Sequence, residues 1–236
     1  MERVNLPGKF LDCNFFWILG IKYDLYYNFL HSFLFLFRFN HPEGVAVDHQ
    51  GNVFVADTGN HAIRFITPTG TVTTIAGTGV PGYKNSKYQG DVAQFSYPSA
   101  IAYWRDWQQS RQPDPNDPDS FIEINGQGRQ ILFVADTGNH CIRKITANNN
   151  KNDDNIWNNV TVTCFSGPCI GIDKNLGPGY VDGERHDAKF DSPKGLTVSN
   201  KGLIYVADTN NHVIRQIDRL GNVKTLPSNL FRTKVS

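Results

Sequence analysis

Three features are scarce in this sequence: charge of one sign, cysteine, and uninterrupted apolar stretches. The 236 residues carry 23 Lys and Arg against 22 Asp and Glu, which leaves a formal net charge of +1. This balance gives no support for a nucleic-acid partner or for binding to an anionic membrane surface. Four cysteines in a chain of this length do not indicate a disulfide scaffold.

Two of the cysteines lie close together in the sequence. Cys164 and Cys169 are near enough to close a small loop in an oxidising compartment. Without knowledge of the compartment, we expect two free thiols. Asn159-Val160-Thr161 is a glycosylation sequon, which matters only in a secreted protein.

Residues 1–38 are aromatic and apolar, but they fit no standard targeting segment. A membrane-spanning helix needs about 20 mostly apolar residues. Four polar residues interrupt this stretch, namely Lys22, Asp24, Asn28 and His31. No Ala-x-Ala-like cleavage site follows it. Three interpretations stay open: a poor membrane anchor, a segment buried by a partner, or sequence outside the natural protein such as a gene-model error. The abrupt start of a regular pattern at Phe39 favours the last.

What the sequence does contain is an internal repeat. Val-Ala-Asp-Thr-Gly-Asn-His occurs at 55–61 and 134–140, and it recurs as Val-Ala-Asp-Thr-Asn-Asn-His at 206–212. Phe-x-x-Pro precedes each copy, at 39–42, 95–98 and 190–193. An Ile-Arg pair follows each copy, at 63–64, 142–143 and 214–215. Self-similarity of this kind is typical of repeat architectures.

Each copy has the pattern of four short strands joined by tight turns. In copy one the predicted strands are 44–48, 53–56, 62–66 and 71–75, and in copy three they are 195–198, 203–206, 213–217 and 222–226. Short β-branched runs separated by Gly and Asn predict an antiparallel meander. One meander cannot bury both of its faces, so neighbouring copies must stack.

The segments between the copies are patterned as well. Gly82-Tyr83 and Gly179-Tyr180 correspond, and each pair is followed by an Ala and a Phe at matching offsets. We therefore expect structured connections. Copy two carries an insertion at about 104–130, in which 111–120 is predicted to be a solvated surface loop. The Asn- and Asp-rich stretch 148–158 is predicted to be disordered or loosely held.

These residues resemble the NHL-repeat family over about 39–226. The resemblance rests on Phe-x-x-Pro-x-Gly-Val-Ala-Val-Asp followed by Gly-Asn-Val-Phe-Val-Ala-Asp-Thr-Gly-Asn-His-Ala-Ile-Arg. It implies an all-β fold, a partial β-propeller of three four-stranded antiparallel blades at 39–76, 95–165 and 190–226. Propellers typically close with 4 to 8 blades, so three make an incomplete ring. Members of this family mostly present propeller faces to proteins, and some to RNA.

The repeated polar positions are expected to be structural. They are Asp57, Asn60, His61 and Arg64; Asp136, Asn139, His140 and Arg143; and Asp208, Asn211, His212 and Arg215. The Asp-Thr-Gly triplets suggest an aspartic protease, but the repeat already explains them, and a turn Asp ordinarily accepts the amides that follow it. The histidines are expected to bond locally, since adjacent blades hold them too far apart for one metal ion. The arginines form either a basic rim or pairs with the Asp of their own blade, and the second is favoured.

Positions that break the repeat are better candidates for function. The insertion carries Trp104, Trp107 and Phe121, which either anchor a partner or cover the blade edge. We expect a non-catalytic interaction scaffold without a cofactor. Its partner is expected to be a protein, further propeller blades or a second copy of this chain. The alternative is a metal-dependent propeller lyase or lactonase, for which the candidate inner strands offer no convergent ligand set.

Overall fold

A computed structural model describes residues 38–106, 128–148, 155–168 and 177–227, and the backbone of 111–114 and 117–123. The segment 1–37, with its three interpretations, lies outside the described residues. Among the described residues, none forms a helix long and apolar enough to cross a membrane. The chain from Phe39 onward is one compact unit.

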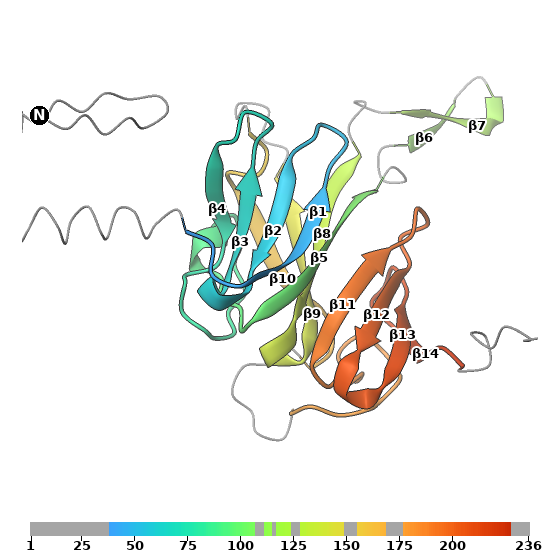
Figure 1. Cartoon of the computed structure of the whole chain (residues 1–236). Coiled ribbons are helices and arrows are strands. Elements are labelled where there is room, and N and C mark those ends of the chain that lie inside the picture. Colours follow the sequence, from blue (N-terminus) through green and yellow to red (C-terminus); the bar gives the residue numbers. More distant parts are fainter. Residues whose placement is uncertain are drawn as a thin grey trace, which may run out of the picture. The chain divides into compact units, whose positions relative to one another are not determined.

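The repeats build three four-stranded antiparallel sheets, which confirms the predicted fold class (Figure 1). Blade one consists of β1 (Pro42–Val47), β2 (Val53–Asp57), β3 (Ala62–Ile66) and β4 (Val72–Ala76). Blade two consists of β5 (Pro98–Asp106), β8 (Arg129–Asp136), β9 (Cys141–Ala147) and β10 (Val160–Ser166). Blade three consists of β11 (Pro193–Val198), β12 (Ile204–Asp208), β13 (Val213–Ile217) and β14 (Val223–Thr225).

The three blades share one register and one turn. A bulge follows the first strand residue in each blade, after Pro42, Pro98 and Pro193. The repeated heptapeptide then ends the second strand and forms a short 3₁₀ turn, as η1 (Thr58–Asn60), η4 (Thr137–Asn139) and η6 (Thr209–Asn211). The histidine after each turn has a left-handed backbone, with φ of 50°, 52° and 56°. Few residues other than glycine adopt this conformation. Because all three turns share it, the histidine backbone has the same orientation in each blade.

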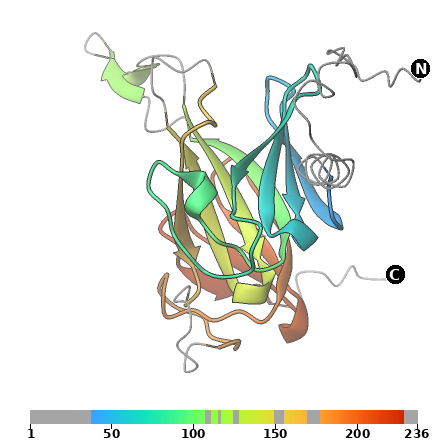
Figure 2. The same ribbon diagram turned by 90° about the vertical axis from the view of Figure 1, so that its left-hand side faces the viewer.

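The insertion in blade two is partly regular structure, so the prediction that 111–120 is an irregular loop is wrong. Strands β5 and β8 keep pairing as far as Asp106 and Arg129, inside the expected insertion. Beyond them, β6 (Arg111–Asp114) and β7 (Asp117–Glu123) form a separate antiparallel hairpin. It projects past the ends of the blades in both views (Figures 1 and 2). A proline is tolerated there because each strand of a two-stranded ribbon has an unpaired edge.

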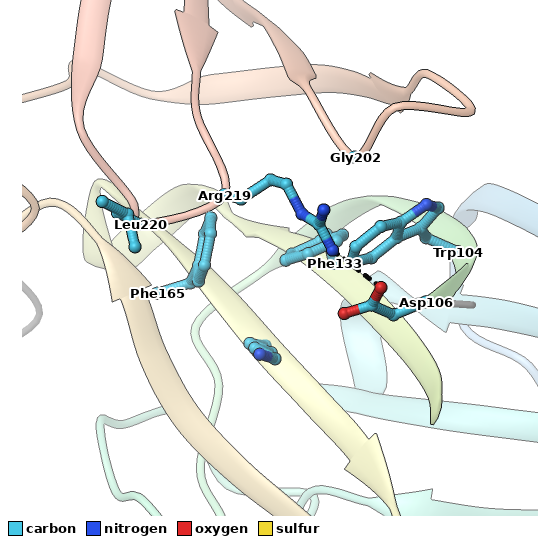
Figure 3. A pocket seen from close by; sticks show the side chains of 8 residues that line it. Trp104, Asp106, Phe133, Phe165, Gly202, Arg219 and Leu220 are labelled. Carbon is cyan, nitrogen blue, oxygen red and sulfur yellow. Dashed lines mark hydrogen bonds and ion pairs between the residues drawn. The ribbon is translucent and has the colours of Figure 1, made fainter. Parts of the chain in front are cut away.

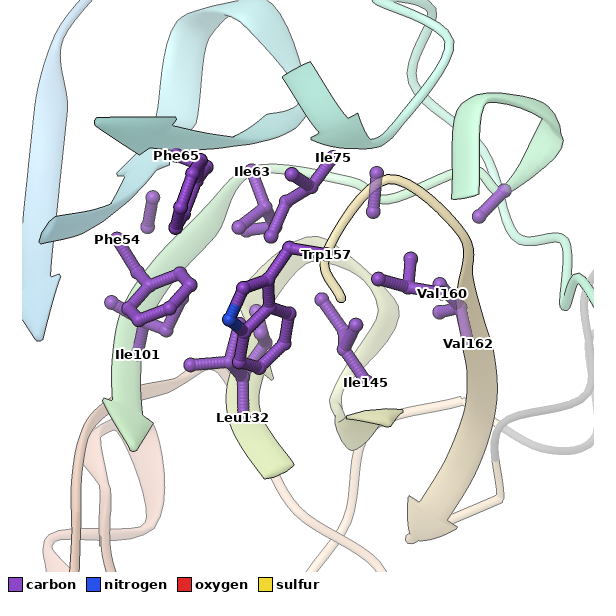
Figure 4. Close-up of a cluster of buried hydrophobic side chains, with 14 of the residues drawn as sticks. Phe54, Ile63, Phe65, Ile75, Ile101, Leu132, Ile145, Trp157, Val160 and Val162 are labelled. Atoms are coloured by element: carbon purple, nitrogen blue, oxygen red, sulfur yellow. The ribbon is translucent and has the colours of Figure 1, made fainter. Parts of the chain in front are cut away.

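Blades one and two meet across a shared apolar core (Figure 4). Trp157 lies at its centre, only 1% exposed, with its ring edge against Phe54 at 4.7 Å between centroids. This indole falls within the 148–158 stretch predicted to be loosely held. The prediction of a loosely held stretch is wrong for its last residues, around Trp157, because this side chain fills the space between the two sheets. Residues 149–154 lie outside the described part of the chain. A second core joins blades two and three.

Candidate functional site

The repeated aspartates are buried in each blade and bind the backbone of its first segment. Asp57, Asp136 and Asp208 are fully buried. Their Oδ1 atoms accept the backbone N–H of Asn40, Ser96 and Asp191, at 2.7, 2.7 and 2.8 Å. The expectation that these carboxylates accept the amides that follow them is therefore wrong. They instead hold the Phe-x-x-Pro segment at the start of the same blade, because the bulge brings that segment beside the turn.

The repeated arginines pair with these aspartates. Arg64, Arg143 and Arg215 approach the Oδ2 atom of the aspartate in their own blade at 2.7, 2.9 and 2.7 Å. Arg143 and Arg215 are completely buried, so a basic rim of these side chains is excluded. This is the arrangement that the sequence favoured. The burial raises the pKa of Asp136, and Arg143, Asn139 and the Ser96 amide oppose that rise.

Arg143 and Arg215 also hold the connections that precede their blades. Arg143 donates to the carbonyls of Lys84 and Gln94, and Arg215 donates to those of Val181 and Lys189. A tyrosine stacks on each guanidinium, with Tyr83 at 4.5 Å and Tyr180 at 5.1 Å from the ring centroid. The repeated Asn139 and Asn211 bind the aspartate and also the carbonyls of Gly82 and Gly179. These bonds explain why the connections are patterned.

Threonine and histidine link each blade to the next one. We call the contact of blades one and two joint one, and that of blades two and three joint two. The hydroxyls of Thr58 and Thr137 donate to the carbonyls of Pro98 and Pro193, both at 2.7 Å. Nδ1 of His61 accepts the N–H of Tyr97 at 3.1 Å, and Nδ1 of His140 accepts that of Ser192 at 3.0 Å.

His61 and His140 therefore bond between blades, and for these two the expectation of a local bond is wrong. Burial lowers the pKa of His61, which favours the neutral ring that an accepting Nδ1 requires. Among the described residues no three His, Cys, Asp or Glu side chains gather as metal ligands.

The cysteines divide into two kinds. Cys141 has a free, fully buried thiol, and burial raises its pKa well above the ordinary value. Cys164 takes part in a disulfide bond, so the expectation of a free thiol at this position is wrong. Cys169 lies outside the described residues.

Joint two contains a groove of about 340 Å³, lined in part by residues at which the copies of the repeat differ (Figure 3). From blade two it is lined by Trp104, Asp106, Phe133, Lys144 and Phe165, and from blade three by Gly202, Arg219 and Leu220. Arg219 reaches across from the β13–β14 turn, 5.0 Å over the Trp104 ring, and pairs with Asp106 at 2.7 Å. Leu220 is exposed at the groove's border.

Lys144 adds a positive charge to the groove, in addition to the ion pair of Arg219 and Asp106. In the repeat register it occupies the position of Phe65, which is a core residue in joint one. Its ammonium lies 5.8 Å over the Phe165 ring. Burial lowers the pKa of Lys144, and the nearby Arg129, Arg185 and Arg219 lower it further, while Asp106 opposes them. Three arginines and one carboxylate thus act on Lys144, and that carboxylate, Asp106, already binds Arg219.

Sequence reasoning reached only part of this groove. Of the three predicted anchors, Trp104 is half-buried in the groove and also packs on the core of joint two. Phe121 lies in β7, where its backbone pairs with Pro113. Trp107 lies outside the described residues. Lys144 and Arg219 were missed, although comparing the copies position by position shows a lysine where copy one has a phenylalanine.

Two family models match the chain. The teneurin NHL domain matches residues 117–234, half of the chain, and the NHL repeat matches 39–64. Among curated proteins, SUPPRESSOR OF QUENCHING 1 of Arabidopsis thaliana is 35% identical over 48% of this chain. Human NHL repeat-containing protein 2 is 36% identical over 37% of it. The chain spans only 8% and 9% of these two relatives.

Solved structures agree on the fold. An auxiliary nutrient binding protein from Bacteroides ovatus superposes with a TM-score of 0.54 at 17% identity, over 78% of this chain and 37% of its own. A counterpart from Bacteroides thetaiotaomicron gives 0.53 at 18% identity, over 77% of this chain and 36% of its own. At this identity the likeness concerns the fold alone. With its three repeats, its blades and the two matching models, the chain belongs to the NHL-repeat family of β-propeller proteins.

Proposed function

We propose that this chain is a non-catalytic NHL-repeat propeller module that serves as a protein-interaction scaffold. Its docking site is the groove at joint two, and the ligand is an acidic segment of a partner protein. The observation that carries this proposal is Lys144, a cation lining the groove at the position where copy one has Phe65 and copy three has the uncharged Gln216. Partial burial of a charge costs free energy unless an opposite charge offsets it.

The lining of the groove fits a peptide that combines carboxylates with an apolar side chain. Lys144 and Arg219 supply positive charge, while Trp104, Phe133 and Phe165 supply aromatic surface. Tryptophan and arginine are over-represented among residues that dominate binding energy at protein interfaces. An anionic segment also suits the field of the neighbouring Arg129 and Arg185.

We propose that the hairpin β6–β7 supplies further contact surface for the partner. Strands β5 and β8 carry groove residues, and the hairpin belongs to the insertion between them (Figures 1 and 2). We propose that Trp107 and Phe121, which belong to the same insertion, also contact the partner. Interaction surfaces are commonly built on such loops, which a rigid scaffold positions.

The test is binding of a labelled acidic pentapeptide, four glutamates around one phenylalanine, measured by fluorescence anisotropy. Lys144→Ala and Arg219→Ala should each weaken binding by roughly tenfold, as expected for a charge-assisted contact. Lys224→Ala, which removes an exposed lysine on β14, should leave binding unchanged. Added salt should weaken binding because the contact is electrostatic. Equal binding of a peptide with lysines in place of glutamates would refute the proposal.

The enzyme alternative needs its own measurement. A metal-dependent lyase or lactonase would retain a stoichiometric divalent ion after purification, which elemental analysis detects. A tightly bound ion that Lys144→Ala does not displace would favour the enzyme and count against a purely scaffolding role.

A further inference from the structure

The two internal joints use the same connectors, and each outer blade carries one half of them that bonds to no other blade among the described residues. At both joints a threonine hydroxyl meets a proline carbonyl, and a histidine Nδ1 meets a backbone N–H two residues after the repeated phenylalanine. Blade three has the outgoing half, and blade one has the incoming half. This inference concerns a different surface from the groove and does not depend on the proposed function.

The outgoing half on blade three is already formed. Thr209 and His212 occupy the same 3₁₀ turn as their counterparts, with the same left-handed histidine. Both side chains are exposed, whereas Thr58 and His61 are buried at joint one. Within the described chain the Thr209 hydroxyl reaches only the Ala207 carbonyl of its own blade.

The incoming half on blade one is formed as well. The donors at the two joints are Tyr97 and Ser192, both at φ 49°, and the corresponding His41 has φ 47°. A left-handed backbone is unfavourable for residues other than glycine. Blade one nevertheless holds this uncommon shape at His41, although no neighbouring blade in the described part of the chain receives its N–H. Pro42 occupies the place of Pro98 and Pro193, whose carbonyls accept the threonine hydroxyls.

Apolar side chains accompany both halves. Phe39 is 38% exposed, whereas its counterparts Phe95 and Phe190 are fully buried at the joints. Val45 and Val47 of β1 are 61% and 57% exposed on the incoming side. On the outgoing side Ile214 is 37% exposed, although Ile63 and Ile142 at the same position are completely buried. Both edges thus present apolar surface around the connectors.

We propose that blade three receives blade one of a second copy of this chain and forms a third joint of the same kind. Thr209 would donate to the Pro42 carbonyl, and His212 would accept the His41 N–H. Because one chain carries both halves, the contact is head-to-tail, and two such joints close two copies into a ring of six blades. That number falls in the range of 4 to 8 blades with which propellers close.

The first experiment measures the mass of the full chain by light scattering over a range of concentrations. A dimer should be present and should dissociate on dilution. Thr209→Val with His212→Ala removes the outgoing half, and Val45→Asp with Val47→Asp blocks the incoming half. Each pair should raise the dimer dissociation constant by roughly tenfold or more, since two joints are affected at once. Leu220→Ala, an exposed apolar residue at the groove, is the matched control and should change nothing.

Mixing the two variants separates a head-to-tail contact from a symmetric one. In the mixture one joint combines both defective halves, while the other combines both intact halves. A heterodimer should therefore form where neither variant dimerises alone. If either variant alone dimerised like the parent, or if mixing restored nothing, the head-to-tail joint would be wrong. A monomer at every concentration would likewise overturn the proposal and would mean that other residues of the chain cover the two edges.

Discussion

At the scale of single residues, equivalent positions in two connections accept the same arginine hydrogen bond with different side chains, one neutral and one charged. Asn85 and Asp182 both accept a hydrogen bond from the arginine of the following blade, Arg143 and Arg215 respectively. Asp182 also accepts bonds from the amide and hydroxyl of Thr225. Partial burial alone would raise the pKa of Asp182, but these bonds from Thr225 and Arg215 outweigh it and lower the pKa below its ordinary value of 3.8.

This shift predicts how acid affects stability. A carboxyl whose pKa is lower in the folded state stabilises the protein above its unfolded pKa, and that contribution is lost as the pH falls through the folded pKa. Asp182→Asn should therefore flatten the fall in the free energy of unfolding below pH 4, measured by urea titration. Asn85→Asp should steepen it. Asp91→Asn, an exposed side chain, is the control, and parallel acid profiles for all three variants would contradict the prediction.

The buried pair Asp136–Arg143 should be more sensitive than the pair Asp57–Arg64 of blade one. Removing one partner of a buried ion pair leaves the other charge uncompensated and typically costs about 3–5 kcal/mol. Asp136→Ala should thus destabilise more than Asp57→Ala, because Arg64 keeps some contact with water whereas Arg143 has none. Chemical denaturation of the two variants measures the difference. Equal losses would mean that burial of the arginine does not set the cost.

At the scale of elements, the hairpin β6–β7 should be dispensable for folding. Replacing residues 107–128 with Asn-Gly would join β5 and β8 through a two-residue turn of the type that suits antiparallel strands. Pairing between Asp106 and Arg129 brings the two strand ends together already. The melting temperature should change little, and the cooperativity should persist. A broad or early transition would show that the hairpin supports blade two.

Trp157 should behave in the opposite way. Truncating a large buried aromatic side chain typically costs about 3–5 kcal/mol because it leaves a cavity. Trp157→Ala should therefore destabilise strongly, although the residue belongs to an Asn- and Asp-rich stretch. Thermal melting compares it with Trp104→Ala, which should cost less because Trp104 is half-buried. The reverse order would place the tryptophan outside the core of joint one.

These elements also show what the sequence could predict. The strands were predictable because turn residues and β-branched runs recur at fixed offsets in three copies. The hairpin was not, because its Pro- and Asp-rich composition resembles a solvated loop. Trp157 and Lys144 were missed for a different reason. Their roles depend on which face of each blade packs on its neighbour, and composition within one blade does not contain that information. For Lys144, only the comparison with Phe65 of copy one marks the position.

At the scale of the whole molecule, blade two differs from its neighbours because both of its faces are covered. One face packs on blade one and the other on blade three, through the two apolar cores. Blades one and three each have one covered face within the described chain. In stacked repeats, stability is close to a sum of the intrinsic stability of each repeat and its contacts with the neighbouring repeats. Blade two has two such contacts and should be the most stable.

Hydrogen exchange tests this order directly. In dilute protein the amides of β8 and β9 should exchange more slowly than those of β2, β3, β12 and β13, since local opening of an outer blade breaks one joint and opening of blade two breaks both. Raising the concentration should slow exchange around 39–47 and 209–214 if blades one and three of separate copies meet, and it should leave β8 and β9 unchanged. Uniform protection of the three sheets in dilute protein would show instead that the joints contribute little and that each blade is stabilised from within, through its own buried aspartate and arginine.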